Sequence, residues 1–284
     1  MAQSKFKLKL NPEAAAQLGL VWYKGEALEV EEYIRRVAPD LKFRGSLSVL
    51  KGLPINSLPS DLQVRGDLDL SYCDELQTLP KGLVVGGDLE LQCCSSLKSL
   101  PEDLVVKGSL FLFGCTSLET IPSSIKIGKN LEYQGCHFKT FPKVIIGGNL
   151  LIEDSQSLST LASGIEAKNL FLGQNTQLVS IPPDLKIKNN IGITYCESFK
   201  SLPKGLRVKG SLDLEGCTSL ETLPEGLMVQ GDLELGECIS LKSLPSGLEV
   251  GGDIVLRGCT SLSKELPMDL VVGGKVYPLN LYNT

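Results

Sequence analysis

The sequence predicts a solenoid built from one short repeat. Three observations predict it: a proline, usually after a leucine, recurs every 20 to 22 residues; apolar and polar residues alternate within each repeat; and a cysteine recurs at one repeat position. A fixed period of this length is typical of solenoids, in which each unit buries its apolar edge only against its neighbours. We assign residues 39–276 to eleven full repeats and a partial one, between an N-terminal region (1–38) and a C-terminal tail (277–284).

The repeat consensus is L-P-x-x-L-x-V-x-G-x-L-x-L-x-x-C-x-x-L-x-x. In the segment "GDLDL", Leu68 and Leu70 are expected to point into the solenoid, while Asp69 and the following Ser71 point out. The segment "LQV" alternates as well, which predicts that the opposite wall is also extended. Gly66 lies between the two segments and would let the chain bend there without a Cβ clash.

Composition and charge exclude several functional classes. Hydrophobic residues make up 42% of the chain, enough to form a core, yet no stretch approaches the roughly 18 consecutive apolar residues that would span a bilayer. The first residues, "MAQSKFKLKLNPEAAAQ", lack the unbroken apolar segment of a secretory signal. The net charge of −5 argues against nucleic acid as a partner, because phosphate contacts need clustered Lys and Arg. We therefore expect no transmembrane segment and no nucleic-acid partner.

Eight of the nine cysteines take the same repeat position, and only Cys93 lies outside this series. Disulfide scaffolds are short, secreted and irregularly spaced, and zinc sites need close pairs such as C-x-x-C. The regular spacing therefore predicts buried free thiols in a reducing compartment. The series consists of Cys73, Cys94, Cys115, Cys136, Cys196, Cys217, Cys238 and Cys259.

The repeat resembles the leucine-rich repeat. "LDLSYCDELQTLP" (68–80) matches the pattern L-x-L-x-x-(N/C)-x-x-L-x-x-L-P, and the short repeats with "LP" are similar to those of a bacterial class of effector proteins injected into host cells. The resemblance implies a parallel β-sheet on a concave face, an extended or irregular convex wall, and a ladder of side chains that hydrogen-bond the backbone of the turns. The eight cysteines would form this ladder, with Ser155 and Asn175 in the two central repeats that lack cysteine.

Residues 1–38 do not repeat and are expected to form a small α/β cap, because a solenoid end exposes its apolar core. The segment "KFKLKL" alternates like an edge strand. Asn11 and Pro12 suit the N-cap and first turn of a short helix that Gly19 would end, and a second helix is expected over 29–37. The alternative interpretation of this region is a secretion signal.

The sequence offers little that would support catalysis. His137 is the single histidine and adjoins Cys136, but Cys136 takes an inward ladder position, so we expect no thiol–imidazole pair. Cys93 is expected at or near the surface, without a neighbouring His or Lys cluster that would activate it. Known nucleotide-binding, zinc-protease and nucleophile motifs do not occur. The chain is therefore predicted not to be an enzyme, with no catalytic residue, metal or cofactor.

The outward positions of the predicted concave strand vary most. "GSLFLFGCTSLETIP" and "GSLDLEGCTSLETLP" are near-copies that differ chiefly where two phenylalanines replace two acids. Along the stack, acids dominate both flanks and apolar residues the middle, with Gly192 expected to leave a dent. Exposed aromatic clusters rimmed by charge are the usual anatomy of a binding site, although phenylalanines that merely pack together are the alternative. The predicted partner-binding residues are Phe111, Phe113, Glu132, Leu151, Glu153, Phe171, Asp213 and Glu215.

Two further columns are interpreted as structural. Asn130, Asn149, Asn169 and Asn190 precede successive strands, where stacked amides would hydrogen-bond along the sheet. Lysines and arginines mark the outward positions of the opposite wall, where they are more often needed for solvation and edge protection than for binding. They are Arg65, Lys107, Lys126, Lys168, Lys186, Lys188, Arg207 and Lys209.

These observations predict a protein–protein interaction module that binds a basic or mixed apolar and basic partner through its concave face. The resemblance implies a bacterial effector that acts on a host protein. Two alternatives stay open: the substrate-recognition part of a larger ubiquitin-ligase-type enzyme whose catalytic domain is absent here, and an intracellular structural scaffold. We expect the protein to be cytoplasmic, or secreted without a cleavable signal peptide into a reducing host compartment.

Overall fold

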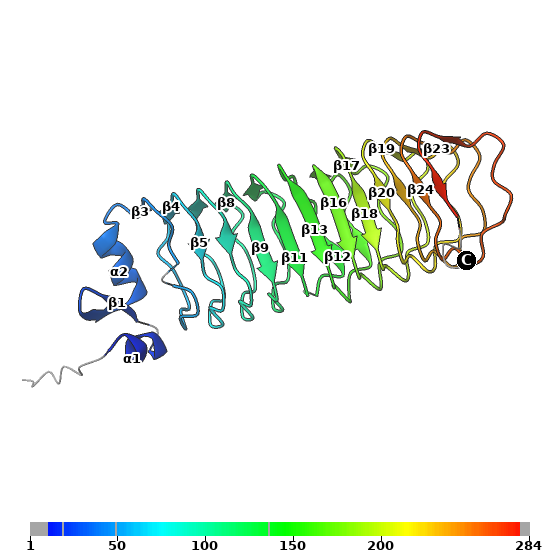
Figure 1. Cartoon of the computed structure of the whole chain (residues 1–284). Helices are drawn as coiled ribbons and strands as arrows, with labels where there is room; N and C mark the ends of the chain where they lie inside the picture. Colours follow the sequence, from blue (N-terminus) through cyan, green and yellow to red (C-terminus); the bar gives the residue numbers. More distant parts are fainter. Residues whose placement is uncertain (1–10, 19, 49, 136, 279–284) are drawn as a thin grey trace, which may run out of the picture.

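Each repeat forms one coil of a parallel β-solenoid of about 11 turns, which confirms the solenoid that the period predicts. The computed structural model describes residues 11–18, 20–48, 50–135 and 137–278. Figure 1 shows the coils stacked in one row, with the two described helices at the N-terminal end. The leucine-rich-repeat class and the concavity of one face stay predictions.

The alternating x-L-x-L-x segments build an eleven-stranded parallel sheet in which neighbouring strands belong to neighbouring coils. The register keeps equivalent positions level, so that Phe111 pairs with Glu132 and Glu132 with Leu151. We call this sheet the long sheet. Its strands are β5 (Leu68–Asp69), β7 (Leu89–Glu90), β9 (Leu110–Phe113), β11 (Leu131–Gln134), β13 (Asn149–Glu153), β16 (Asn169–Gly173), β18 (Ile191–Thr194), β20 (Leu212–Asp213), β22 (Leu233–Glu234), β24 (Ile254–Val255) and β26 (Val276–Tyr277).

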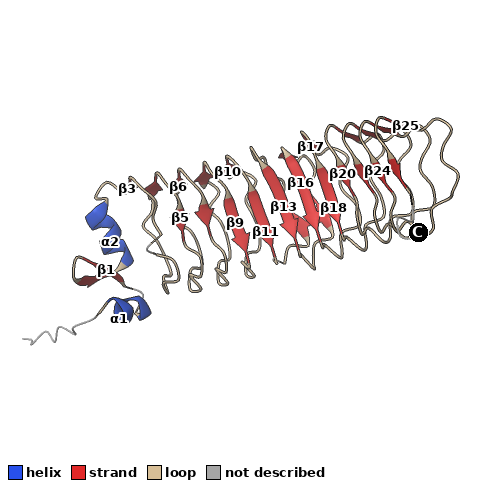
Figure 2. Cartoon of the chain, in the orientation of Figure 1, coloured by secondary structure: helices blue, strands red, loops and turns tan. Residues whose placement is uncertain are grey.

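The strands are longest in the middle of the long sheet (Figure 2). Two flanking strands end for a local reason: Asp69 Oδ1 accepts a hydrogen bond from Ser71 N at 2.9 Å, and Asp213 Oδ1 accepts one from Glu215 N at 3.0 Å. Such bonds within one coil compete with the ladder for the amide. Phe111 has no acceptor to offer, and its strand continues to Phe113.

The opposite wall consists of two-residue strands in separate short sheets, so its pairing is interrupted, for example between β17 and β19. The first sheet holds β3 (Lys42–Phe43), β4 (Gln63–Val64), β6 (Val84–Val85), β8 (Val105–Val106) and β10 (Lys126–Ile127). The next two hold β15 (Glu166–Ala167) with β17 (Lys186–Ile187), and β19 (Arg207–Val208), β21 (Met228–Val229), β23 (Glu249–Val250) and β25 (Val271–Val272). At the turn before the proline, β12 (Thr140–Phe141) pairs with β14 (Thr160–Leu161).

The core is one continuous column of apolar side chains between the two walls. Each buried aliphatic side chain stabilises the folded coil by roughly 1.5–3 kcal/mol relative to exposure, but only when the next coil covers it. In the second coil six apolar residues are buried, among them Leu68 and Leu70, which the alternation predicts to point inward. The six are Leu62, Val64, Leu68, Leu70, Leu76 and Leu79.

A row of short polar side chains just before the long-sheet strands links neighbouring coils, and we call it the polar row. Asp67 Oδ1 accepts from Asp88 N at 2.9 Å, and Asp88 Oδ1 accepts from Ser109 N at 2.7 Å. The row ends at Lys275, whose backbone N–H donates to Asp253 Oδ1 at 2.7 Å. Its ammonium side chain contains no oxygen that could accept an N–H from a further coil. Members whose oxygen accepts the next coil's N–H are Ser46, Asp67, Asp88, Asn130, Asn169, Asn190, Ser211, Asp232 and Asp253.

The sequence indicates the asparagine part of this row, and the structure extends it to aspartate and serine. The glycines before the row are explained by the same contact. A Cβ at Gly87 would lie 2.0 Å from Asp67 Oδ1, and one at Gly86 would lie 2.2 Å from Arg65 O. The clash that glycine avoids is therefore with the preceding coil, and it is not a requirement of a bend within the coil.

The cysteines form a second row of bonds between coils. Cys94 Sγ donates to Leu70 O at 3.1 Å and Cys217 Sγ to Ile193 O at 3.0 Å, and Asn175 Nδ2 donates to Ile152 O at 2.8 Å. Buried thiols at Cys73, Cys115, Cys196, Cys238 and Cys259 make the equivalent bond. All cysteines in the described part of the chain are free. Cys136 lies outside the described residues.

Ser155 differs from the other members of the cysteine series. It is buried, but its Oγ contacts Glu153 O in its own coil at 3.4 Å. The link to the next coil runs instead through its N–H, which donates to Asn175 Oδ1 at 3.1 Å. Serine is too short to reach the preceding coil, and the longer asparagine side chain bridges this place.

The N-terminal region contains α1 (Pro12–Gln17), β1 (Val21–Tyr23), β2 (Glu26–Leu28) and α2 (Val30–Val37). Both expected helices are present, and Asn11 Oδ1 accepts from Ala14 N at 2.7 Å as an N-cap. Val30 and Ile34 belong to the same core as the first coil. A capping role stays a prediction, and the expected strand at 5–10, the helix stop at Gly19 and residues 279–284 lie outside the described residues.

Candidate binding site on the long sheet

A hollow of about 260 Å³ opens on the outer face of the long sheet, where the sequence predicts the binding site. Outward residues of β9 form one side of it and those of β13 the other, with β11 between them. Neighbouring strands are about 4.8 Å apart, so the two sides are separated by roughly twice that distance. The lining residues are Gln92, Phe111, Phe113, Glu132, Tyr133, Gln134, Leu151 and Glu153. We call this feature the central hollow.

The aromatic side of the central hollow is accessible to a partner. Phe113 is 47% exposed, and Phe111 and Leu151 are half-buried. Five of the eight predicted binding residues, those on β9, β11 and β13, therefore share one hollow. Their proximity follows from the register, because residues one repeat apart in sequence lie on adjacent strands and residues two repeats apart lie on every second strand of the sheet.

Phe171 lies outside the central hollow. It is level with Leu151 on the neighbouring strand, and its Cδ1 lies only 3.0 Å from where a Cβ on Gly192 would stand. The ring therefore covers Gly192, which is buried. The dent that the sequence suggests at Gly192 is filled by Phe171, and the missing side chain makes room for this ring.

The two remaining predicted residues, Asp213 and Glu215, have partners within the chain. Asp213 is half-buried and accepts the Glu215 amide, while Glu215 Oε1 lies 3.8 Å from Arg257 Nη2. At the other flank, Asp69 Oδ2 lies 3.0 Å from Lys51 Nζ. Several flanking acids are thus engaged internally, and the polar row accounts for others.

The central carboxylates differ from those at the flanks. Among the described residues, neither Glu132 nor Glu153 forms an ion pair, and no Lys or Arg lines the central hollow. Glu153 is exposed and Glu132 half-buried. The hollow therefore combines an aromatic side with carboxylates that the rest of the described chain leaves available.

Sequence reasoning missed Gln92 and Tyr133 as lining residues. Ser71, expected to point outward, is fully buried, and its hydroxyl donates to Gln92 Oε1. Tyr133 lines the hollow from the core side, where its ring stacks on Phe138 at a centroid distance of 4.7 Å. A signal was present: Tyr133 and Phe138 stand where the repeat consensus has leucine.

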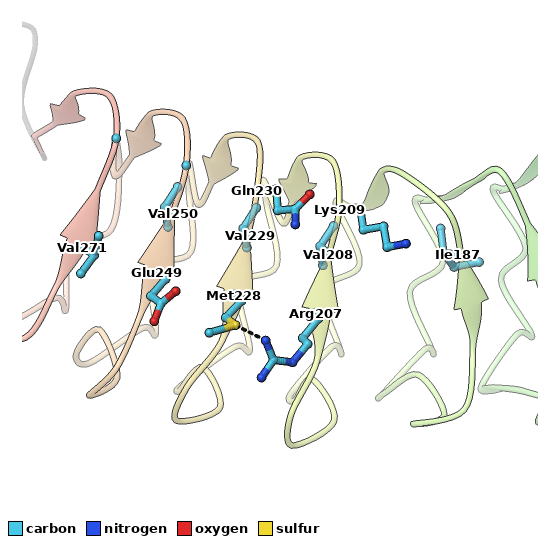
Figure 3. Close-up of a pocket in the computed structure, with 12 residues that line it drawn as sticks. Ile187, Arg207, Val208, Lys209, Met228, Val229, Gln230, Glu249, Val250 and Val271 are labelled. Carbon is cyan, nitrogen blue, oxygen red and sulfur yellow. Dashed lines mark hydrogen bonds between the residues drawn. The ribbon is translucent and has the colours of Figure 1, made fainter.

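A second hollow, of about 470 Å³, lies on the opposite wall along β19, β21, β23 and β25 and reaches Ile187 of β17. Figure 3 shows Arg207, Met228 and Glu249 on successive strands at its rim, with Arg207 directed at the sulfur of Met228. Valines of these strands form the floor. The lysines and arginines expected to be outward on this wall are exposed, but Glu166 pairs with Lys186 at 2.6 Å and Glu249 adds a further acid. The wall is therefore mixed in charge.

His137 is exposed, and Cys93 is half-buried with a positive φ of 58°. Within the described ranges, no group of three or more His, Cys, Asp or Glu side chains could hold a metal ion. No described helix has the length and apolar character needed to cross a membrane.

No family model matches the chain, and searches of curated proteins and of solved structures find no significant match. What the molecule does must therefore be argued from its surface. The central hollow is the place where exposed apolar rings, available carboxylates and a concave shape coincide.

Proposed function

We propose that this chain is a protein-interaction module that binds a partner through the outer face of the long sheet, centred on the central hollow. The leucine-rich-repeat class, the concavity of this face and a role as a bacterial effector belong to the same proposal and rest on the sequence resemblance. The partner carries a basic, or mixed apolar and basic, surface.

One observation supports the proposal most directly: Phe113 presents 47% of its surface to solvent beside Phe111 and Leu151 in a hollow. An exposed aromatic side chain does not contribute its burial energy to the fold. Partly exposed rings in a depression, surrounded by polar groups, are the features that interface hot spots share. The solenoid stacks coils of one shape, so side chains that differ only on this face are free to serve recognition.

The test is affinity capture from a cell lysate with the wild-type chain and with Phe113→Asp. Aspartate at this outward position places a charge where the partner would bury a ring, and we expect the captured partners to be lost. Ile239→Asp is the matched control, because Ile239 is similarly exposed at 44% but lies on a turn of another coil. Ile239→Asp should recover the same partners as the wild type.

Circular dichroism and thermal unfolding check that both variants fold. The proposal is wrong if folded Phe113→Asp captures the same partners as the wild type. It is also wrong if Ile239→Asp loses them equally, since the effect would then reflect surface charge and not the central hollow.

A further inference from the structure

We infer that the central hollow receives an arginine side chain of the partner, held between the Phe111 and Phe113 rings and the carboxylates of Glu132 and Glu153. This inference rests on the proposed function, because it specifies the chemistry of the partner at the same site. It concerns only the central hollow, while the rest of the proposed partner interface is formed by neighbouring strands of the long sheet.

The arrangement of the lining supplies two different contacts for one side chain. Phe111 and Phe113 stand on β9, Glu153 stands on β13, and Glu132 lies between them on β11. A planar guanidinium can stack on an aromatic face and, through its edge, donate to a carboxylate. Lysine provides a point charge and cannot make both contacts with one flat group.

Other occupants fit the hollow less well. An aliphatic or aromatic side chain would cover Glu132, which is already half-buried, and would remove water from its carboxylate without a compensating donor. An acidic side chain would meet two carboxylates of like charge. A basic side chain with an apolar stem satisfies both the rings and the acids.

The chain itself uses arginine in a comparable arrangement. Arg257 lies on the coil two beyond Glu215, across Gly236, and its Nη2 lies 3.8 Å from Glu215 Oε1 in another group of outward residues on the flank. No equivalent cation of the described chain lines the central hollow, whose acids lie on the same face. An arginine of the partner would supply to Glu132 and Glu153 the guanidinium that Arg257 supplies to Glu215 at the flank.

The probe is N-acetyl-arginine amide, titrated into the full chain while NMR follows the Leu151 methyl and Phe113 ring signals. We expect saturable shifts at these positions. N-acetyl-citrulline amide, which has nearly the same shape without charge, and N-acetyl-norleucine amide should bind at least about tenfold more weakly. The double variant Glu132→Gln, Glu153→Gln should weaken binding of the arginine probe by about tenfold and leave norleucine binding unchanged.

Glu234→Gln is the matched control, because Glu234 is an acid of the same face that lies outside the central hollow. It should leave the arginine titration unchanged. The inference is overturned if the arginine probe causes no saturable shift, if citrulline binds equally well, or if the double variant binds arginine as the wild type does.

Failure of this inference and failure of the proposed function give different results. If Phe113→Asp loses the captured partners while Glu132→Gln, Glu153→Gln keeps them, the face binds a partner but arginine recognition is wrong. If Phe113→Asp keeps the partners while the arginine probe still binds with the expected selectivity, the hollow has the inferred chemistry but the proposed function is wrong.

Discussion

At the scale of single residues, Asp69 and Asp213 occupy the same repeat position in opposite environments. Burial alone would raise the pKa of Asp69, but hydrogen bonds from Ser71 and the nearby Lys51 ammonium hold it below its ordinary value. Burial raises the pKa of Asp213, and the charge of Glu215 raises it further, against the hydrogen bond from the Glu215 amide. The two carboxylates therefore contribute to stability with opposite sign.

We predict that Asp213→Asn stabilises the protein at pH 7 and that Asp69→Asn destabilises it, each by about 1 kcal/mol or less. Because the pKa of Asp213 is raised in the folded chain, its contribution to stability is lost as pH rises through that raised pKa. In Asp213→Asn the side-chain amide carries no charge at any of these pH values and still offers an oxygen that accepts from Glu215 N. The lowered pKa of Asp69 means that its contribution is present above the ordinary value and is lost as pH falls.

Urea unfolding at pH 7 and at about pH 2.5 measures both effects. Protonation of the aspartates at the lower pH reduces these charge effects, so the difference between each variant and the wild type should be smaller than at pH 7. Changes of the same sign at pH 7 would contradict the assignment of the two environments.

At the scale of the element, the polar row joins successive coils through hydrogen bonds from side-chain oxygens. We predict that Asp232→Ala is less stable than Asp232→Asn by about 1 kcal/mol. Both variants remove the same charge, but only asparagine keeps an oxygen for the Asp253 amide, which Asp232 Oδ1 accepts at 2.8 Å. Free energies of unfolding from urea titration give the comparison.

Glu234→Gln serves as the control for this pair because Glu234 lies outside the polar row. Burial raises the pKa of Glu234, and nearby acids, Asp213 foremost, raise it further, so its neutralisation should not cost stability at pH 7. Equal stability of Asp232→Ala and Asp232→Asn would show that the row contributes no measurable free energy.

The elements follow from the sequence where a repeat position has one requirement. Alternating leucines predict the long-sheet strands, and Asn11 with Pro12 predicts the start of α1. The β1–β2 hairpin is not predicted from the sequence, because strands of three residues are too short to show alternation. Lys24 and Gly25 between them have positive φ of 48° and 85°, as a tight hairpin turn requires. The prediction of a dent at Gly192 is wrong because the role of this glycine depends on the ring of Phe171 in the preceding coil.

At the scale of the whole molecule, the buried cysteine row makes the solenoid sensitive to alkaline pH. Burial raises the pKa of Cys73 to about 11 and that of Cys94 and Cys238 to about 12. Unfolded thiols ionise near pH 8.5. The stability that depends on the protonated thiols is therefore complete below that pH and is lost progressively as pH rises through the raised values.

We predict that the free energy of unfolding falls above about pH 9 and that Cys238→Asn reduces this slope, because asparagine makes the corresponding bond at Asn175 without titrating. Urea unfolding between pH 7 and 10.5 measures the slope. A thiol reagent at pH 8 should modify Cys93 before any other described cysteine. An unchanged slope in Cys238→Asn, or rapid modification of the buried row in the folded protein, would contradict this account.

The site is predictable at the level of position but not of shape. Strand phase alone places Phe111, Phe113 and Leu151 on one face, because every second residue points outward. It does not show that Phe171 turns away or that Glu215 meets Arg257, since rotamers and contacts across two coils are not encoded in a period. Acids of the polar row, such as Asp88, look like surface charge in the sequence and are structural.

The polar row also gives the stack a direction. In most coils of the row a side-chain oxygen accepts the N–H of the coil that follows, and the bonds all run in this one direction. The last of these bonds is donated by the backbone N–H of Lys275, whose own side chain ends in an ammonium group and not in an oxygen. A coil inserted outside the coils of β7 to β13, with Asp, Asn or Ser at this position, would repeat the same link, so the length of the molecule could change by whole coils while the central hollow keeps its lining.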